Sequence, residues 1–149
     1  MVKYTMLDLS AFTGPILVTA AYFVLWYALL FRQTRTKRRL RAEYEARNQT
    51  FDRYFGQDRQ MLAVDRAAAN THEQMVPFLC ALWLHAAVVS VAVATALGSF
   101  YVGFRALYPM LLGHEVDKMQ SKRVLFATGP AYLIVYYLLG STVWVALGG

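Results

Sequence analysis

The sequence predicts an all-α integral membrane protein in which 149 residues form a single domain, a four-helix bundle over residues 1–149. Three observations favour this class. Only 16% of the residues are charged, whereas soluble domains average roughly 25%. The mean hydropathy is +0.35. The apolar residues also gather in long uncharged runs, and a run of about 20 residues crosses the roughly 30 Å hydrocarbon core as a helix.

The uncharged runs cover residues 12–31, 74–104 and 124–147. The middle run is too long for one span and too short for two, so we place a break at residues 95–99, where glycine and small polar residues punctuate a helix. The predicted helices are therefore about 11–33, 64–94, 98–113 and 122–147. A β-barrel is disfavoured, because alternating segments of about ten residues do not occur.

Positive charge marks one face of the predicted bundle. Basic residues crowd residues 32–47, after the first helix, and residues 114–123, before the fourth, while the link between the second and third helices has none. Four spans put both basic loops on the same face, and the positive-inside rule makes that face cytoplasmic or the equivalent inner face of an organelle. Topology and contact with anionic membrane lipid then explain the net charge of +6. No nucleic-acid partner is expected.

Metal and disulfide chemistry find little support in the sequence. The three histidines stand apart from one another, so no metal site is expected. We interpret His85, which interrupts the middle apolar run, as a packed or interfacial residue. Cys80 is the only cysteine, and an intrachain disulfide is therefore excluded.

Polar residues precede the middle apolar run, in the sequence DRAAANTHEQMVPF at residues 65–78. Four of them fall at i, i+4, i+7 and i+11, which is one stripe of a helix. They are Arg66, Asn70, Glu73 and Pro77. A charge at membrane depth costs a few kcal/mol or more, so it faces a bundle interior, pairs with another group or has a function. Arg66 and Glu73 lie about 10 Å apart along the axis, too far to pair directly.

A second cation, Arg105, lies at comparable depth on the third predicted helix, on a stripe with Tyr108. An ion pair between Glu73 and Arg105 is a natural structural explanation for two of these charges. That explanation leaves Arg66 and Asn70 without a role. Each charge needs a partner on a neighbouring helix, in a second subunit or in a ligand, so a structural and a ligand-binding interpretation both stay open.

The stretch RAAANTHEQMVPFLCALW resembles the second-helix signature of the MAPEG family, the membrane-associated proteins in eicosanoid and glutathione metabolism. That signature reads Arg-Ala-x-x-Asn-x-x-Glu and is followed by Pro-Phe and an apolar helix. The matching residues are Arg66, Ala67, Asn70, Glu73, Pro77 and Phe78. The third helix of the family carries an arginine followed three residues on by an aromatic residue or histidine, and RALY supplies Arg105 and Tyr108.

The resemblance implies a homotrimer of four-helix subunits that binds glutathione, as a co-substrate, between neighbouring subunits near the cytoplasmic face. The expected activity is that of a transferase or peroxidase acting on a lipophilic small molecule. Arg66 and Arg105 are the candidates to hold the carboxylates of glutathione through charge-assisted hydrogen bonds. Glu73 is the candidate for its ammonium group, and Asn70 and Tyr108 can add further hydrogen bonds.

Arg123 is the candidate catalytic residue, because KRVLF resembles the start of the fourth helix in the family, which often opens with an arginine. A neighbouring cation lowers the pKa of a thiol, and the thiolate is the reactive form. The structural alternative is that Arg123 anchors the fourth helix at the membrane interface by snorkelling.

Three departures from the family pattern leave the activity open. Leu112 stands where a tyrosine often follows the third-helix arginine, and Gln74 stands where some members have tyrosine. The segment 48–65 is also longer and more polar than expected. Two alternatives to an enzyme follow: a non-catalytic structural subunit of a larger membrane complex, with other membrane subunits as partners, and a lipid-presenting helper protein.

Overall fold

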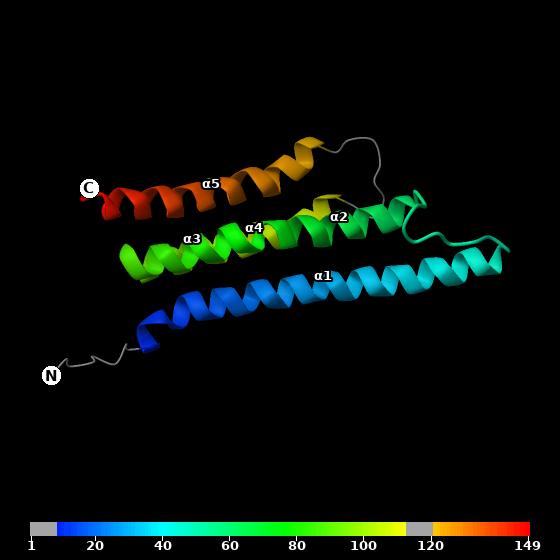
Figure 1. Cartoon of the computed structure of the whole chain (residues 1–149), viewed down its shortest axis with the longest axis horizontal. Helices are drawn as coiled ribbons and strands as arrows, with labels where there is room; N and C mark the ends of the chain where they lie inside the picture. Colours follow the sequence, from blue (N-terminus) through cyan, green and yellow to red (C-terminus); the bar gives the residue numbers. More distant parts are fainter. Residues whose placement is uncertain (1–8, 113–120) are drawn as a thin grey trace.

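The computed structural model describes residues 9–112 and 121–149, and all regular structure in these residues is helical. Its elements are the short 3₁₀ helix η1 (Leu9–Phe12), α1 (Thr13–Ala46), α2 (Arg59–Glu73), α3 (Met75–Val88), α4 (Val91–Leu112) and α5 (Ser121–Ala146). The helices lie side by side along one long axis (Figure 1). The predicted all-α bundle is confirmed, but four of the predicted helix ends are wrong.

The first helix continues far beyond its predicted end near residue 33, because α1 runs to Ala46. The uncharged run marks where a helix leaves the hydrocarbon, not where its backbone ends. The basic segment that follows contains no glycine or proline and is rich in strong helix formers. Pairs at i, i+4 support it, with nitrogen–oxygen distances of 3.5 Å for Arg39–Glu43 and 3.0 Å for Arg41–Glu45.

The predicted second helix, 64–94, is two helices joined at Gln74. Pro77 has no backbone N–H to donate to the carbonyl of Glu73, and a proline also disfavours regular helix just before it. The interruption therefore falls between the polar first half and the apolar second half of the MAPEG-like stretch. At the other end, α2 begins earlier than predicted, since the Asp58 side chain accepts hydrogen bonds from the backbone N–H groups of Gln60 and Met61.

The turn between the second and third predicted spans lies at Val89–Ser90, not at residues 95–99. The N–H groups of Val89 and Ser90 both donate to the carbonyl of His85, at 2.9 and 3.0 Å, and close α3. Ser90 Oγ accepts from the N–H of Val93 and caps α4. Gly98, the expected helix breaker, instead lies inside α4 at a close helix contact.

Three helices are long and apolar enough to cross a membrane, and they are α1, α4 and α5. The fourth segment consists of the polar α2 and the apolar α3, which has only 14 residues. These helices support the prediction of an integral membrane protein.

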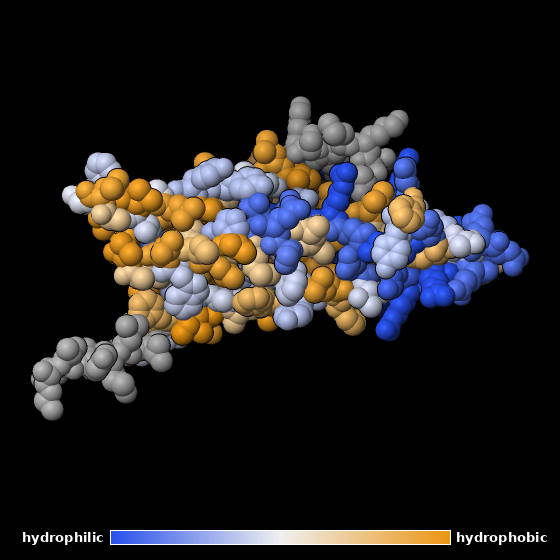
Figure 2. Space-filling view, viewed as in Figure 1, coloured by the Kyte–Doolittle hydropathy of each residue, from blue (hydrophilic) through white to orange (hydrophobic). Residues whose placement is uncertain are grey.

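The hydrophilic and the apolar parts of the bundle lie at opposite ends of its long axis. The end of α1, the start of α2, the end of α4 and the start of α5 point the same way, and the start of α1 and the end of α5 point the other way (Figure 1). Hydrophilic residues cover the projecting end of the α1–α2 pair, whereas apolar residues dominate the opposite end (Figure 2). Most of the second predicted basic loop, 114–123, lies outside the described residues, and the cytoplasmic sidedness stays a prediction.

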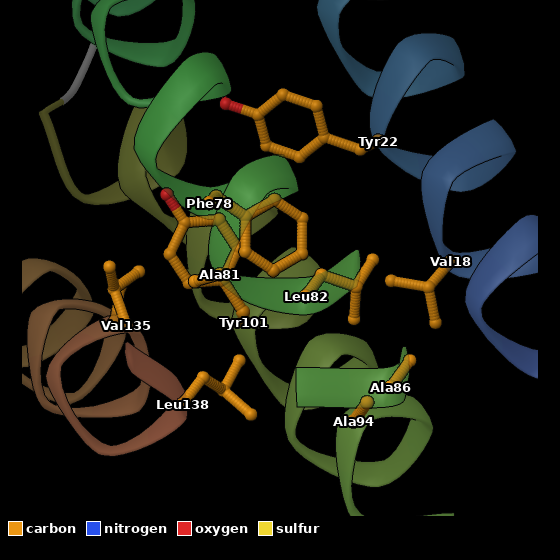
Figure 3. Close-up of a cluster of buried hydrophobic side chains, with 11 residues drawn as sticks. Val18, Tyr22, Phe78, Ala81, Leu82, Ala86, Ala94, Tyr101, Val135 and Leu138 are labelled. Atoms are coloured by element: carbon orange, nitrogen blue, oxygen red, sulfur yellow. The ribbon is translucent and has the colours of Figure 1, made fainter. Parts of the chain in front are cut away.

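The main core packs α1, α3, α4 and α5 around two stacked rings (Figure 3). Phe78 and Tyr101 are parallel, with centroids 3.8 Å apart, and Tyr22 lies 5.2 Å from Phe78. Gly98 allows α4 to approach its neighbours here. A Cβ at Gly98 would lie 2.7 Å from a methyl group of Leu82 and 2.9 Å from one of Val18.

We expect Gly98→Leu to lower the melting temperature of the detergent-solubilised protein, because overpacking a filled core costs about 1–3 kcal/mol. Gly103→Leu is the matched control on the same helix, since nothing lies within 4 Å of a Cβ added there. Leucine exceeds glycine in helix propensity by up to about 1 kcal/mol, so the control should be neutral or slightly more stable. Equal melting temperatures for the two variants would contradict close packing at Gly98.

Candidate functional site

Hydrogen bonds between α1 and α2 set the depth of the polar stripe. Gln33 Nε2 donates to Asp65 Oδ1 at 2.7 Å, just beyond the uncharged run 12–31 of α1. Deeper in that run, the Tyr22 hydroxyl donates to the backbone carbonyl of Thr71 at 2.5 Å. The stripe on α2 therefore begins at the edge of the apolar run and descends into it.

Arg105 is held inside the bundle by Asn70. Its guanidinium is 1% exposed, and Nη2 donates to both the backbone carbonyl and the side-chain Oδ1 of Asn70, at 2.7 Å each. The guanidinium also lies over the ring of Tyr108, 5.3 Å from its centroid. Hydrogen bonds that involve a charged group contribute about 1.5–3 kcal/mol, and a cation over an aromatic face adds to this.

The expected ion pair between Glu73 and Arg105 is wrong, because the ion pairs of the described residues do not include it. Helix periodicity explains the difference. At 100° per residue, Glu73 lies nearly opposite the inward face of α2, which carries the buried Ala67 and Thr71. Asn70 lies at the border of that face, close enough to reach Arg105, and Glu73 is exposed.

Two buried polar atoms at this level have no hydrogen-bond partner among the described residues. They are Arg105 Nε and the Tyr101 hydroxyl. In Figure 3 the hydroxyls of Tyr101 and Tyr22 lie toward the same side of the core. An enclosed polar group without a partner costs about 1–3 kcal/mol.

The two remaining binding residues predicted on α2 take no part in the Arg105–Asn70 contact. Arg66 and Glu73 are exposed on α2, and neither forms an ion pair within the described part of the chain. They lie within about one turn of Asn70 on α2, four residues before it and three after it. The site therefore has a buried cation, Arg105, and exposed charges on the neighbouring helix.

Arg123, the predicted catalytic residue, is exposed near the start of α5. The next residue, Val124, packs against the cluster that contains Tyr108 and Ala67. Arg123 thus stands at the level of the site, and the hydrogen bonds and ion pairs of the described residues do not join it to Arg105 or to α2. Sequence reasoning did not include Tyr22 in the site, and no local signal could have found it, since its partner Thr71 lies 49 residues away.

The segment between α1 and α2 explains why the charge of Arg66 is left uncompensated. Its neighbour Asp65 is bound by both nitrogens of Arg53, at 2.8 and 3.0 Å, and by Gln33. Asp52 accepts hydrogen bonds from the N–H groups of Phe55 and Tyr54 within the same segment, which lowers the pKa of the Asp52 carboxyl. The long polar segment is therefore held by its own hydrogen bonds, and its Arg53 pairs with Asp65, the carboxylate next to Arg66 in the sequence.

The two residues that depart from the family pattern, Gln74 and Leu112, pack within the bundle. Gln74 Nε2 donates to the Tyr132 hydroxyl at 3.4 Å, and Leu112 packs against the cluster around Tyr108. His85 is buried, with Nδ1 3.0 Å from Ser141 Oγ, as expected for a packed histidine. No group of three potential metal ligands occurs among the described residues.

The MAPEG family profile matches residues 15–144, a span that begins in α1 and ends in α5. The chain belongs to the MAPEG family. No curated protein is similar enough to this MAPEG protein to serve as a named relative. Membership is consistent with a glutathione-related role or with another role found in the MAPEG family.

We expect Asn70 and Arg105 to be energetically coupled. Asn70→Leu should cost about 1–3 kcal/mol of stability, because it removes an acceptor from a buried guanidinium. In an Arg105→Leu background the same change should cost less, by a coupling of about 0.5–3 kcal/mol. Thermal unfolding of the four proteins in one detergent measures this cycle.

Glu73→Gln is the control for that cycle, since Glu73 is exposed and lies outside the Arg105 contact. Its effect should stay within about 0.5 kcal/mol in either background. If Arg105 is coupled to Glu73 and not to Asn70, the result would contradict the Arg105–Asn70 contact and favour an ion pair between Arg105 and Glu73.

Proposed function

We propose that this MAPEG protein is a glutathione-dependent membrane transferase or peroxidase acting on a lipophilic electrophile, with the glutathione thiolate as nucleophile. The observation that carries the proposal is the clustering of Arg105, Asn70 and Tyr108 at the edge of the apolar run. Arg66 and Glu73 stand exposed beside this cluster. This arrangement offers separated positive and negative groups to one ligand.

The charges of the cluster complement those of glutathione, which has two carboxylates, one ammonium and a thiol. Arg66 and Arg105 can bind carboxylates, and the guanidinium fork suits their planar geometry. Glu73 can accept from the ammonium. The side-chain NH₂ of Asn70 remains a donor, because only its oxygen is engaged by Arg105.

We propose further that the site is completed in a homotrimer. Arg66, Glu73 and Arg123 are exposed in the single chain at a level where a lipid neighbour is costly for a charge. A neighbouring subunit would cover them and turn the exposed half of the site into an enclosed one. The lipophilic acceptor would then approach from the bilayer. In a transferase, the thiolate sulfur would bond to the electrophilic carbon while the bond from that carbon to its leaving group breaks. In a peroxidase, the sulfur would attack a hydroperoxide oxygen, the O–O bond would break to release the alcohol, and a second glutathione would then form the disulfide and release water.

Thiol activation is assigned to Arg123 in this proposal. In Arg123→Ala, the pKa of the bound thiol should rise towards its free value of about 8.5. Each unit corresponds to about 1.4 kcal/mol. Arg123→Lys keeps the charge but loses the planar fork, so its titration should be intermediate. The measurement is the thiolate absorbance of bound glutathione against pH in purified protein.

Arg38→Ala is the matched control, because Arg38 is an exposed cation on the basic end of α1. Its curve should coincide with that of the wild type. Superimposable curves for all variants would leave Arg123 as a membrane anchor. Absence of glutathione binding in every protein would favour a non-catalytic structural subunit or a lipid-presenting helper.

Ligand binding and thiol activation should separate by residue. Arg66→Gln and Glu73→Gln remove contacts that are similar in the ground and transition states, so each should raise KM more than it lowers kcat. A lost charge-assisted hydrogen bond of about 1.5–3 kcal/mol corresponds to a rise of about tenfold or more. Steady-state kinetics at varied glutathione provides the test, and a fall in kcat at unchanged KM would contradict the binding role.

A further inference from the structure

A basic recess lies on one flank of the α1–α2 pair, close to the end of the uncharged run of α1. It has a volume of about 560 Å³. Its lining residues are Arg32, Arg35, Thr36, Arg39, Gln60 and Val64. Three arginines at i, i+3 and i+7 share one stripe of α1. We call this feature the Arg32 recess. It is separate from the Arg66–Arg105 site and does not depend on the function proposed for that site.

The Arg32 recess sits at the depth of lipid headgroups. Arg32 is the first charged residue after the uncharged run 12–31, which is long enough to cross the hydrocarbon core. Phe31, one turn below Arg35, is 70% exposed and offers an apolar surface beside the recess. Val64 forms an apolar part of its wall. The recess thus joins a cationic upper part to an apolar lower border.

The charge of the Arg32 recess is not compensated by its lining, which contains no carboxylate. Among the described residues, the side chains of Arg32 and Arg35 have no hydrogen-bond or ion-pair partner. Only Arg39 is engaged, by Gln60 and by Glu43 at 3.5 Å. Two guanidinium groups are therefore free to bind an anion.

A second recess, on the other flank of α1, makes a useful contrast. It has a volume of about 420 Å³ and is lined in part by Lys37, Arg41 and Arg53. Its arginines are already paired, Arg41 with Glu45 at 3.0 Å and Arg53 with Asp65 at 2.8 Å. The two flanks carry similar numbers of cations, but among the described residues the Arg32 recess leaves two of its three arginines unpaired, whereas both arginines of the second recess are paired.

We propose that the Arg32 recess binds the phosphate of an anionic phospholipid headgroup. Guanidinium forks bind phosphate oxygens in pairs, and the Thr36 hydroxyl can donate a further hydrogen bond. The glycerol and acyl parts of the lipid would lie along Val64 and Phe31. Free inorganic phosphate offers the same oxygens without the apolar part, so the position of the recess favours the lipid.

The test compares two charge-matched variants of the full-length protein in zwitterionic micelles. R32Q/R35Q removes two unpaired arginines from the recess. K37Q/R38Q removes the same charge from neighbouring positions outside it. Native mass spectrometry with added phosphatidic acid gives the apparent Kd of each protein. We expect R32Q/R35Q to weaken binding about tenfold or more and K37Q/R38Q to change it less than about twofold, since only the first loses charge-assisted contacts.

Two further arms make the outcome decisive. R32K/R35K keeps the charge and loses the forks, so intermediate binding is expected even if R32Q/R35Q folds poorly. Phosphatidylcholine should bind much more weakly than phosphatidic acid. Equal weakening in the two charge-matched variants, equal binding of phosphatidylcholine, or no lipid retained by the wild type would overturn the proposal. Displacement of the lipid by millimolar inorganic phosphate would assign the recess to free phosphate instead.

Discussion

Arg105 carries a positive charge at 1% exposure inside a bundle of membrane-spanning length, and the position of α2 follows from that fact. Taking such a charge out of water costs several kcal/mol unless its donors find acceptors. Asn70 supplies two acceptors, so α2 has to hold Asn70 level with Arg105. The bond from Gln33 to Asp65 and the helix break at Gln74 together fix α2 at that level.

The charged residues of α1 and α2 divide into those that have a hydrogen-bond or ion-pair partner and those that have none within the described part of the chain. Asp65 is saturated by Arg53 and Gln33 and cannot neutralise Arg66. Arg66 is left to face outward beside a buried cation whose Nε is itself unpaired. Farther along α1, Arg32 and Arg35 are unpaired at the membrane boundary. The α1–α2 pair therefore exposes unpaired cations at two depths, Arg66 on α2 and Arg32 with Arg35 on α1.

The uncharged runs were enough to predict the class of fold, because a bilayer demands long apolar helices whatever the sequence detail. They could not locate helix ends, since hydropathy reports the surroundings and not the backbone, and α1 continues as a helix in its basic part. Gly98 was predicted as a turn and is instead a packing contact. Periodicity placed Asn70 on one stripe and Arg105 with Tyr108 on another, but it did not predict that Asn70 is the residue that binds Arg105. It could not show that Glu73 faces away from Arg105, because that depends on how α2 is rotated against its neighbours.

The shortness of α3 has a consequence for the surrounding bilayer. Its 14 residues span about 21 Å at 1.5 Å per residue, well under the roughly 30 Å of an average hydrocarbon core. The membrane beside this segment must become thinner, or the polar residues of α2 must enter the hydrocarbon, and either response costs free energy that grows with the mismatch. Bilayer thickness then acts directly on the stretch that carries Arg66 and Glu73. A thin membrane is the environment in which this segment sits with the least strain.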